Sequence, residues 1–187
     1  MIKKYIVLFL LIALSFTLLI GCSSSENEPL EEPSDNVEEP LEESEETEEE
    51  EEPVNAPNFE LEGIDGETYE LNAFQGKKVI VNFWATWCPY CVEEMPDLTK
   101  LADTYSDDLV VLAVNVDESE SKINSFLENN TDVDLNILLD PKGRTASAYG
   151  ANGLPLSIGI NSDGTVETGY PGMMNYEQME AMYNMLK

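Results

Sequence analysis

The stretch Trp84-Ala85-Thr86-Trp87-Cys88-Pro89-Tyr90-Cys91 decides how this chain folds, and it holds two of the three cysteines. An apolar, β-branched run at residues 78–83 precedes it and predicts a buried strand. The pattern of residues 90–105 predicts an amphipathic helix after it. Cys88 then falls at the helix N-terminus, where free N–H groups and the helix dipole favour a thiolate. Cys91 lies one turn further on, close enough to form a disulfide, so we predict a redox-active pair.

The other roles open to this Cys-x-x-Cys pair are a zinc site and an inert structural disulfide. A structural zinc site needs four ligands, whereas the chain has only this one pair and no histidine. A disulfide between cysteines two residues apart closes almost no loop, so it stabilises the fold little. We therefore favour a redox pair, with no metal and no bound cofactor.

The first 21 residues have the pattern of a targeting segment rather than of a folded domain. A short basic start precedes apolar residues 5–20, and the Gly21-Cys22 step resembles the lipobox of bacterial lipoproteins. In a lipobox, cleavage before the cysteine leaves a thiol that carries lipid. The alternative is an uncleaved anchor, but about 16 apolar residues are fewer than the ~20 that span a bilayer. We predict a signal peptide at residues 1–21 and lipidation of Cys22, which tether the chain outside the cytoplasm.

Residues 22–53 are predicted to be a disordered acidic tether. Residues 26–52 contain sixteen acidic residues and no basic one, so they cannot bury enough apolar surface to fold. The alternative is a tail that binds cations or a partner. The domain that follows, residues 54–187, keeps 22 of the 38 acidic and seven of the nine basic residues, a net charge of −15. This charge argues against nucleic acid as a partner, because its binding needs basic surface.

Residues 54–187 have the length of one domain, and their patterns predict a mixed sheet between helices. Alternating residues around two turns predict hairpins, and long apolar runs predict parallel strands that are covered on both faces. The predicted strands are residues 58–62, 68–71, 77–83, 109–116, 136–140, 156–160 and 166–170. The predicted helices are residues 90–105, 121–130, 144–149 and 176–186.

In their order along the chain, these features resemble the thioredoxin superfamily, and most closely its membrane-tethered TlpA/ResA-like thiol–disulfide oxidoreductases. The resemblance rests on the Trp-Cys-x-x-Cys stretch and on two later motifs, Glu94-Met95-Pro96 and Gly153-Leu154-Pro155. An extra strand–helix unit at residues 137–149 fits the same branch. The resemblance implies an α/β, thioredoxin-like fold: a central mixed β-sheet flanked by helices, with an N-terminal hairpin and a strand–helix insertion.

The resemblance also implies the catalytic roles. Cys88 is expected to be the exposed nucleophile that forms a mixed disulfide, and Cys91 the buried resolving thiol. Asn82 stands where thioredoxins usually carry a buried aspartate, and it cannot take a proton. In this branch the proton relay falls to Glu94, which shares a helix face with Cys91. The alternative for Glu94 is an ordinary exposed helix residue, like Glu93 beside it.

Contact with the substrate is expected at residues around the pair. Trp87 is placed at the rim of the site, and Pro89 and Tyr90 lie between the two cysteines. Pro155 resembles the cis-proline of the superfamily, whose bond turns the Leu154 backbone towards a substrate strand. The alternative is an ordinary trans proline at the start of a strand.

The implied function is the reduction of protein disulfides outside the cytoplasm by a Cys88/Cys91 dithiol–disulfide cycle. Electrons would come from a membrane thiol–disulfide donor, and cytochrome c maturation is one task of the family. A disulfide-forming oxidant of the same fold stays open, because the residues between the cysteines set the potential. A thiol peroxidase is another alternative, although Thr86 stands two residues before Cys88 rather than three, and the domain has only Arg144 as an arginine. A copper carrier would need wider cysteine spacing and a histidine.

Overall fold

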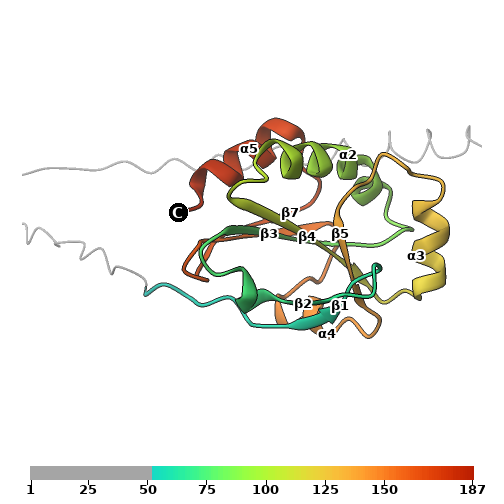
Figure 1. Cartoon of the computed structure of the whole chain (residues 1–187), viewed down its shortest axis with the longest axis horizontal. Coiled ribbons are helices and arrows are strands. Elements are labelled where there is room, and N and C mark those ends of the chain that lie inside the picture. The colour runs from blue at the N-terminus through green and yellow to red at the C-terminus, as the bar shows by residue number, and fades with distance from the viewer. Residues whose placement is uncertain (1–51) are drawn as a thin grey trace, which may run out of the picture. The chain divides into compact units, whose positions relative to one another are not determined.

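Five strands form the central sheet of the domain that the computed structural model describes, residues 52–187 (Figure 1). They are β3 (Lys78–Trp84), β4 (Leu109–Val116), β5 (Asn136–Asp140), β6 (Leu156–Ile160) and β7 (Val166–Pro171). Their order across the sheet is β5-β4-β3-β6-β7. Strands β3, β4 and β5 are parallel, whereas β6 runs antiparallel to β3 and β7 antiparallel to β6. The sheet is therefore mixed, as predicted.

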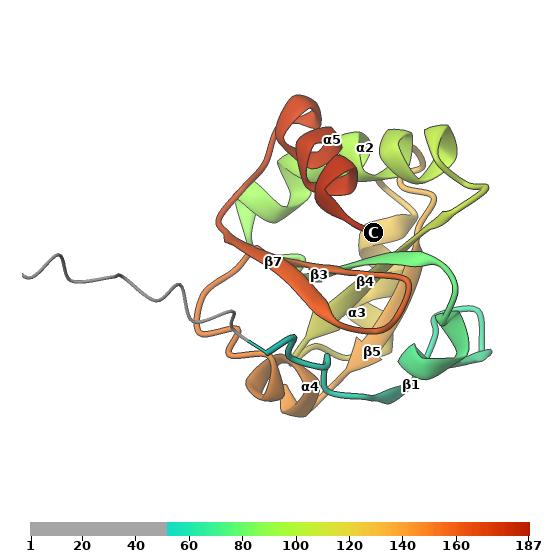
Figure 2. The same ribbon diagram turned by 90° about the vertical axis from the view of Figure 1, so that its left-hand side faces the viewer.

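Helices and a small hairpin cover the two faces of this sheet. The helices are α2 (Pro89–Thr104), α3 (Glu120–Leu127), α4 (Arg144–Ala148) and α5 (Tyr176–Met185), and the hairpin strands are β1 (Glu60–Glu62) and β2 (Thr68–Glu70), followed by the 3-10 helix η2 (Leu71–Phe74). Helices α2 and α5 lie over one face, and the hairpin and α4 lie on the other (Figures 1 and 2). The hairpin is held to β5 by the Ile64 N–H, which donates to the Ile137 carbonyl at 2.9 Å.

Strand β3 lies in the middle of the sheet and divides the core. Because successive side chains of a strand point to opposite faces, alternate residues join different clusters. On the hairpin side lie Val79, Val81 and Phe83. On the α2 side lie Ile80 and Trp84, with Asn82 between them in the same alternation. Burial on both faces explains why the sequence of β3 is a nearly continuous apolar run.

The predicted elements are all present, with small shifts at their ends. Helix α3 ends at Leu127, three residues earlier than predicted. The side chains of Asn129 and Asn130 donate to the carbonyls of Ser125 and Phe126, so they compete with backbone donors at that end. The predicted signal peptide, Cys22 and nearly all of the predicted tether lie outside the described residues. Within residues 52–187, no helix is long and apolar enough to cross a membrane.

Candidate active site

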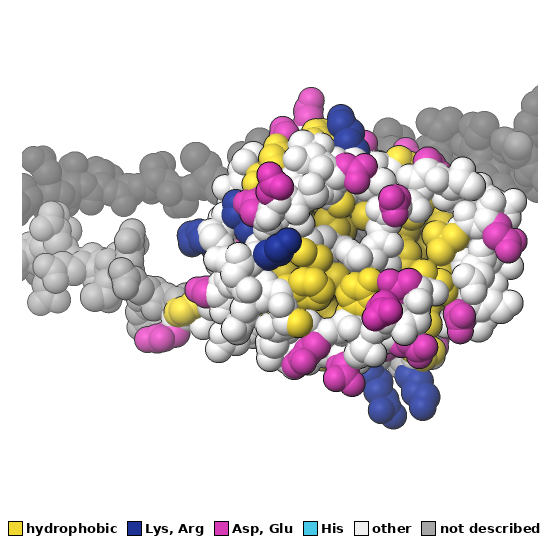
Figure 3. Space-filling model, viewed as in Figure 1, with side chains coloured by type: hydrophobic (Ala, Val, Ile, Leu, Met, Phe, Trp, Pro, Cys, Tyr) yellow, Lys and Arg dark blue, Asp and Glu magenta, His cyan; other side chains and the backbone are white. Residues whose placement is uncertain are grey.

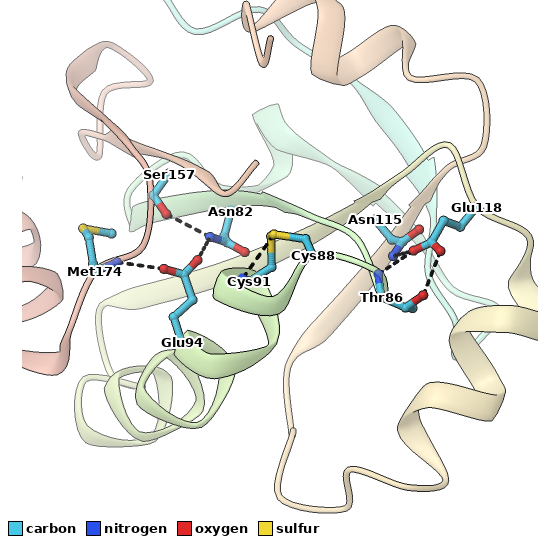
Figure 4. The surroundings of a disulfide bond; sticks show 9 residues. All are labelled: Asn82, Thr86, Cys88, Cys91, Glu94, Asn115, Glu118, Ser157 and Met174. Carbon is cyan, nitrogen blue, oxygen red and sulfur yellow. Dashed lines mark hydrogen bonds between the residues drawn. A yellow bond between two sulfur atoms is a disulfide. The ribbon is translucent and has the colours of Figure 1, made fainter. Parts of the chain in front are cut away.

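Cys88 and Cys91 form a disulfide where β3 ends and α2 begins (Figure 4). Cys88 is the N-cap residue of α2, and its Sγ accepts a hydrogen bond from the N–H of Cys91 at 3.2 Å. Pro89 takes the first helical position, where its missing N–H costs little. The pair thus occupies the helix N-terminus that the strand–helix junction predicted.

The sulfur atoms are covered, while their neighbours are open to solvent. Cys91 is fully buried and Cys88 is only 4% exposed. The expectation of an exposed Cys88 is therefore wrong for the disulfide form, in which its Sγ is turned inward to Cys91. By contrast, Trp87 and Tyr90 are 64% and 63% exposed, and Pro89 is exposed between them. These residues form an apolar rim around a protected disulfide.

A second segment reaches the site from the start of β6. The Leu154–Pro155 peptide bond is cis, and the Leu154 side chain packs against the cluster that contains both cysteines. The carbonyl of Pro155 accepts a hydrogen bond from the Gly172 N–H at 2.8 Å. Residues 153–156 and 171–172 border an open surface cavity of about 390 Å³. Leu154 thus links the disulfide cluster to an accessible hollow.

Glu94 is a buried carboxylate on α2, one turn after Cys91. It is 1% exposed, which contradicts the alternative of an ordinary surface glutamate; Glu93 beside it is exposed. Its Oε1 accepts a hydrogen bond from Asn82 Nδ2 at 2.8 Å, and its Oε2 accepts one from the Met174 N–H at 2.9 Å. Burial raises the pKa of Glu94 from its ordinary value to about 7, although these two hydrogen bonds oppose the rise. Glu94 can therefore gain and lose a proton near neutral pH.

Asn82 fixes the position of Glu94. Its Nδ2 donates both to Glu94 and to Ser157 Oγ, at 2.9 Å for the latter. Since both amide hydrogens are used on that side, the Oδ1 atom is left pointing the other way, towards the disulfide in Figure 4. This Oδ1 is buried and has no hydrogen-bond partner. The asparagine thus holds the carboxylate without competing with it for a proton.

A further buried carboxylate, Glu118, was not predicted from the sequence. It lies between β4 and α3, and it accepts hydrogen bonds from the N–H and hydroxyl of Thr86 at 2.6 and 2.8 Å. It also accepts one from Asn115 and forms an ion pair with Lys122. One signal could have revealed it: the predicted strands before Thr86 and Glu118 are adjacent and parallel, so their carboxyl ends meet at one edge.

The charge on the domain gives no sign of a polyanion site. Acidic side chains are scattered over the face in Figure 3, and basic side chains lie at its left, at its top and at its bottom. In residues 52–187, no group of three or more His, Cys, Asp or Glu side chains lies close enough to hold a metal ion.

Comparison with known proteins identifies the family. The sequence profile described as "AhpC/TSA family" matches residues 54–168. The thioredoxin-like protein YneN of Bacillus subtilis is 38% identical over 128 residues, which cover 67% of this chain and 74% of YneN. This chain belongs to the AhpC/TSA family. The thiol-disulfide oxidoreductase ResA of Halalkalibacterium halodurans is 35% identical over 133 residues, which cover 71% of this chain and 75% of ResA.

A solved structure agrees with the fold. The exposed lipoprotein thioredoxin Etrx1 of Streptococcus pneumoniae has a TM-score of 0.63 and 32% identity, over 68% of this chain and 99% of that one. The relatives and the Cys88–Cys91 disulfide together make this family member a TlpA/ResA-like thiol–disulfide oxidoreductase. The thioredoxin-like α/β fold and the enzyme class predicted from the sequence are confirmed.

Proposed function

We propose that this protein is a lipid-anchored reductase of protein disulfides that works outside the cytoplasm. The observation that carries the proposal is a disulfide at a helix N-terminus with a buried, titratable Glu94 one turn away. The lipobox pattern at Gly21-Cys22 supports the location, as does the description of Etrx1 as an exposed lipoprotein. Its partners are protein disulfides and a membrane thiol–disulfide donor that restores the dithiol.

The reaction is a two-step thiol–disulfide exchange. In the reduced enzyme, the Cys88 thiolate attacks one sulfur of a substrate disulfide, and the other substrate sulfur leaves as a thiolate and takes a proton. Cys91 then attacks the Cys88 Sγ, which breaks the mixed disulfide, releases the second substrate thiolate to be protonated and closes the Cys88–Cys91 bond. Two electrons pass from the enzyme to the substrate; the Cys91 thiol gives up one proton, and water supplies the other proton that the two substrate thiolates take up. The Cys88 N-cap position favours the first step, because the Cys91 N–H already points at its sulfur.

Glu94 serves the second step. Cys91 is fully buried, so its thiol needs a nearby acceptor before it can attack. The carboxylate of Glu94 takes that proton, and a pKa of about 7 suits a group that both gains and loses a proton near neutrality. Asn82 and the Met174 N–H hold its two oxygens in place meanwhile.

The substrate is expected to lie across the apolar rim. Trp87 and Tyr90 offer exposed aromatic surface, and Pro89 lies between them. Leu154, which packs against the disulfide cluster, and Pro155 border the open cavity. An extended protein segment that carries a disulfide fits this arrangement, and a Cys-x-x-Cys-His haem-binding site of a c-type cytochrome is one such substrate that the family resemblance implies.

The direction of the reaction is tested by the reduction potential. The full chain is equilibrated with glutathione buffers, and the fraction of closed Cys88–Cys91 disulfide is measured. A potential well below the ~−180 mV of an isomerase supports a reductase, whereas a value near the ~−120 mV of a strong oxidant reverses the proposal. In parallel, Cys88→Ser is expected to abolish acceleration of insulin reduction by dithiothreitol. Unchanged acceleration would exclude the pair as the catalytic centre.

The role of Glu94 is tested with a matched pair of variants. Glu94→Gln removes the titrating group, so the resolution step is expected to lose its pH dependence near pH 7 and to slow about 100-fold there. Glu93→Gln removes the same charge from the neighbouring exposed position and should leave the profile unchanged. Identical pH–rate profiles for Glu94→Gln and wild type would contradict the proton-relay role. The measurement is single-turnover decay of a Cys88 mixed disulfide.

A further inference from the structure

The loop that presents Cys88 is a single turn with a weakly packed tip. The Cys88 N–H donates to the Ala85 carbonyl at 3.1 Å, so residues 85–88 form a turn with Thr86 and Trp87 at its centre. Trp87 is 64% exposed, and little packing therefore fixes that side of the turn. The conformation of the turn's tip, next to Cys88, then depends on how Thr86 is held.

Thr86 is held at two points by one carboxylate. Its N–H donates to Glu118 Oε2 at 2.6 Å, and its hydroxyl donates to Oε1 at 2.8 Å. Figure 4 shows this contact beside the disulfide, on the side away from Glu94. Two hydrogen bonds to an ionised acceptor are strong and fix direction as well as distance. Glu118 is therefore the anchor of the turn.

Glu118 is itself fixed from its own strand and helix. It is 7% exposed, and Asn115, at the end of β4, donates to its Oε2 at 3.0 Å. Asp117, just before it, has a left-handed backbone with φ of 57°, a conformation that turns the chain sharply after β4. Since Asn115 is paired with Trp84 in the parallel register, the two strand ends bring Glu118 and Thr86 together.

A cation balances this buried charge at the surface. Lys122 Nζ lies 2.6 Å from Glu118 Oε1, one helical turn further on, and the Lys122 side chain is 55% exposed. Burial would raise the pKa of Glu118, but the contacts from Lys122, Thr86 and Asn115 outweigh it and lower the pKa overall. The carboxylate beside the Cys88 turn thus stays ionised at neutral pH, and its charge is partly offset by Lys122.

We propose that Glu118 and Lys122 are positioning residues for the exchange reaction: Glu118 fixes the turn that presents Cys88, and Lys122 offsets the negative charge that would otherwise oppose the Cys88 thiolate. The inference rests on the proposed role of Cys88 as the attacking thiol. A bare carboxylate near the turn disfavours a second negative charge, whereas an ion pair does so much less. The structure therefore separates two effects, geometry from Glu118 and charge balance from Lys122.

The charge effect is tested on Lys122, whose exposed side chain can be replaced without opening the core. The rate of alkylation of Cys88 by iodoacetamide is measured against pH in the reduced full chain. Lys122→Gln is expected to raise the midpoint of this profile by about half a pH unit at low salt and less at high salt. Lys122→Arg should restore the wild-type midpoint. An unmoved midpoint in Lys122→Gln, or an equal shift in Lys122→Arg, overturns the charge-balance role.

The geometric effect is tested by amide hydrogen exchange at Thr86. The Thr86 N–H is expected to stay protected in Lys122→Gln, because the grip of Glu118 remains, and to exchange at least about tenfold faster in Glu118→Gln. Glu120→Gln, at an exposed position two residues away, is the matched control and should behave as wild type. Equal protection in Glu118→Gln and wild type overturns the anchoring role. Neither measurement uses a protein substrate, so these outcomes are independent of insulin reduction and of the reduction potential.

Discussion

Two buried carboxylates lie on either side of the disulfide, Glu94 and Glu118 (Figure 4). Both accept hydrogen bonds from an asparagine on the neighbouring strand and from a backbone N–H. They differ in the remaining contacts. The donors to Glu94 are neutral, whereas Glu118 also accepts a hydroxyl and pairs with the ammonium group of Lys122.

The difference shows how the same side chain serves two purposes. Burial alone favours the neutral form of either carboxyl. At Glu94 burial dominates and raises the pKa to about 7, so the group is suited to moving a proton. At Glu118 the donors and the cation dominate and lower the pKa, so the group stays charged and is suited to holding the backbone. What surrounds each carboxylate therefore decides its role.

The first and largest expected effect is on stability at Glu94. Its folded pKa lies above the ordinary value of 4.5, so between pH 4.5 and 7 the folded protein keeps a proton that the unfolded chain has lost. The contribution of protonated Glu94 to the free energy of unfolding is complete below pH 4.5. It is lost as the pH rises through 7, and the total loss is about 3 kcal/mol. The free energy of unfolding of oxidised wild type relative to Glu94→Gln should fall by that amount between pH 4.5 and 7.5. A constant difference across this range would show that Glu94 resembles an ordinary carboxylate.

The second expected effect concerns Glu118, whose contribution to stability changes with pH in the opposite direction to that of Glu94. An amide offers one acceptor oxygen where the carboxylate offers two, so Glu118→Gln should cost about 2 kcal/mol of unfolding free energy at pH 7. The pKa of Glu118 is lowered in the folded protein. Its contribution to the free energy of unfolding is therefore full above the ordinary pKa of 4.5 and is lost as the pH falls through the folded pKa. The difference between wild type and Glu118→Gln should therefore shrink in acid. Growth of that difference in acid would break the contrast between the two sites.

The third expected effect separates the hydrogen bonds that hold Asn82 next to Glu94 from the titration of Glu94 itself. Ser157→Ala removes the second acceptor of Asn82 Nδ2 and leaves a buried donor unpaired, which should cost about 1 kcal/mol. Ser157 is not hydrogen-bonded to Glu94, so the fall in stability between pH 4.5 and 7.5 should keep its wild-type size. Urea unfolding at several pH values measures both quantities. A changed pH dependence would mean that Ser157 influences the titration of Glu94 as well as the position of Asn82.

Much of the fold was predictable because its signals are local. The continuous apolar runs of β3 and β4 and the alternation of the hairpins follow from burial on two faces or one. Cys88 at the helix N-terminus followed from the junction between a strand and a helix pattern. Helix-face spacing placed Glu94 near Cys91, but the full burial of Glu94 depends on Met174, which is 80 residues away in the chain.

The site residues that were missed depend on contacts between distant segments. Glu118 follows an apolar strand in an acidic sequence, and nothing local separates it from the exposed Asp117 and Glu120 beside it. Its role appears only when the carboxyl ends of β3 and β4 are set side by side. The covered state of Cys88 was also missed, because the motif gives the position of the sulfur but not the direction in which it turns.

The smallest expected effect separates the two contributions within the Glu118 site. Lys122→Gln removes an exposed cation while the hydrogen bonds from Thr86 and Asn115 remain, so it should cost about 0.5 kcal/mol of unfolding free energy, and less at high salt. Most of the loss in Glu118→Gln would then come from the buried hydrogen bonds. Equal losses of unfolding free energy in Lys122→Gln and Glu118→Gln would instead make the ion pair the main stabilising contact. The two carboxylates would then differ only because Glu118 has a cation beside it and Glu94, among the described residues, has none.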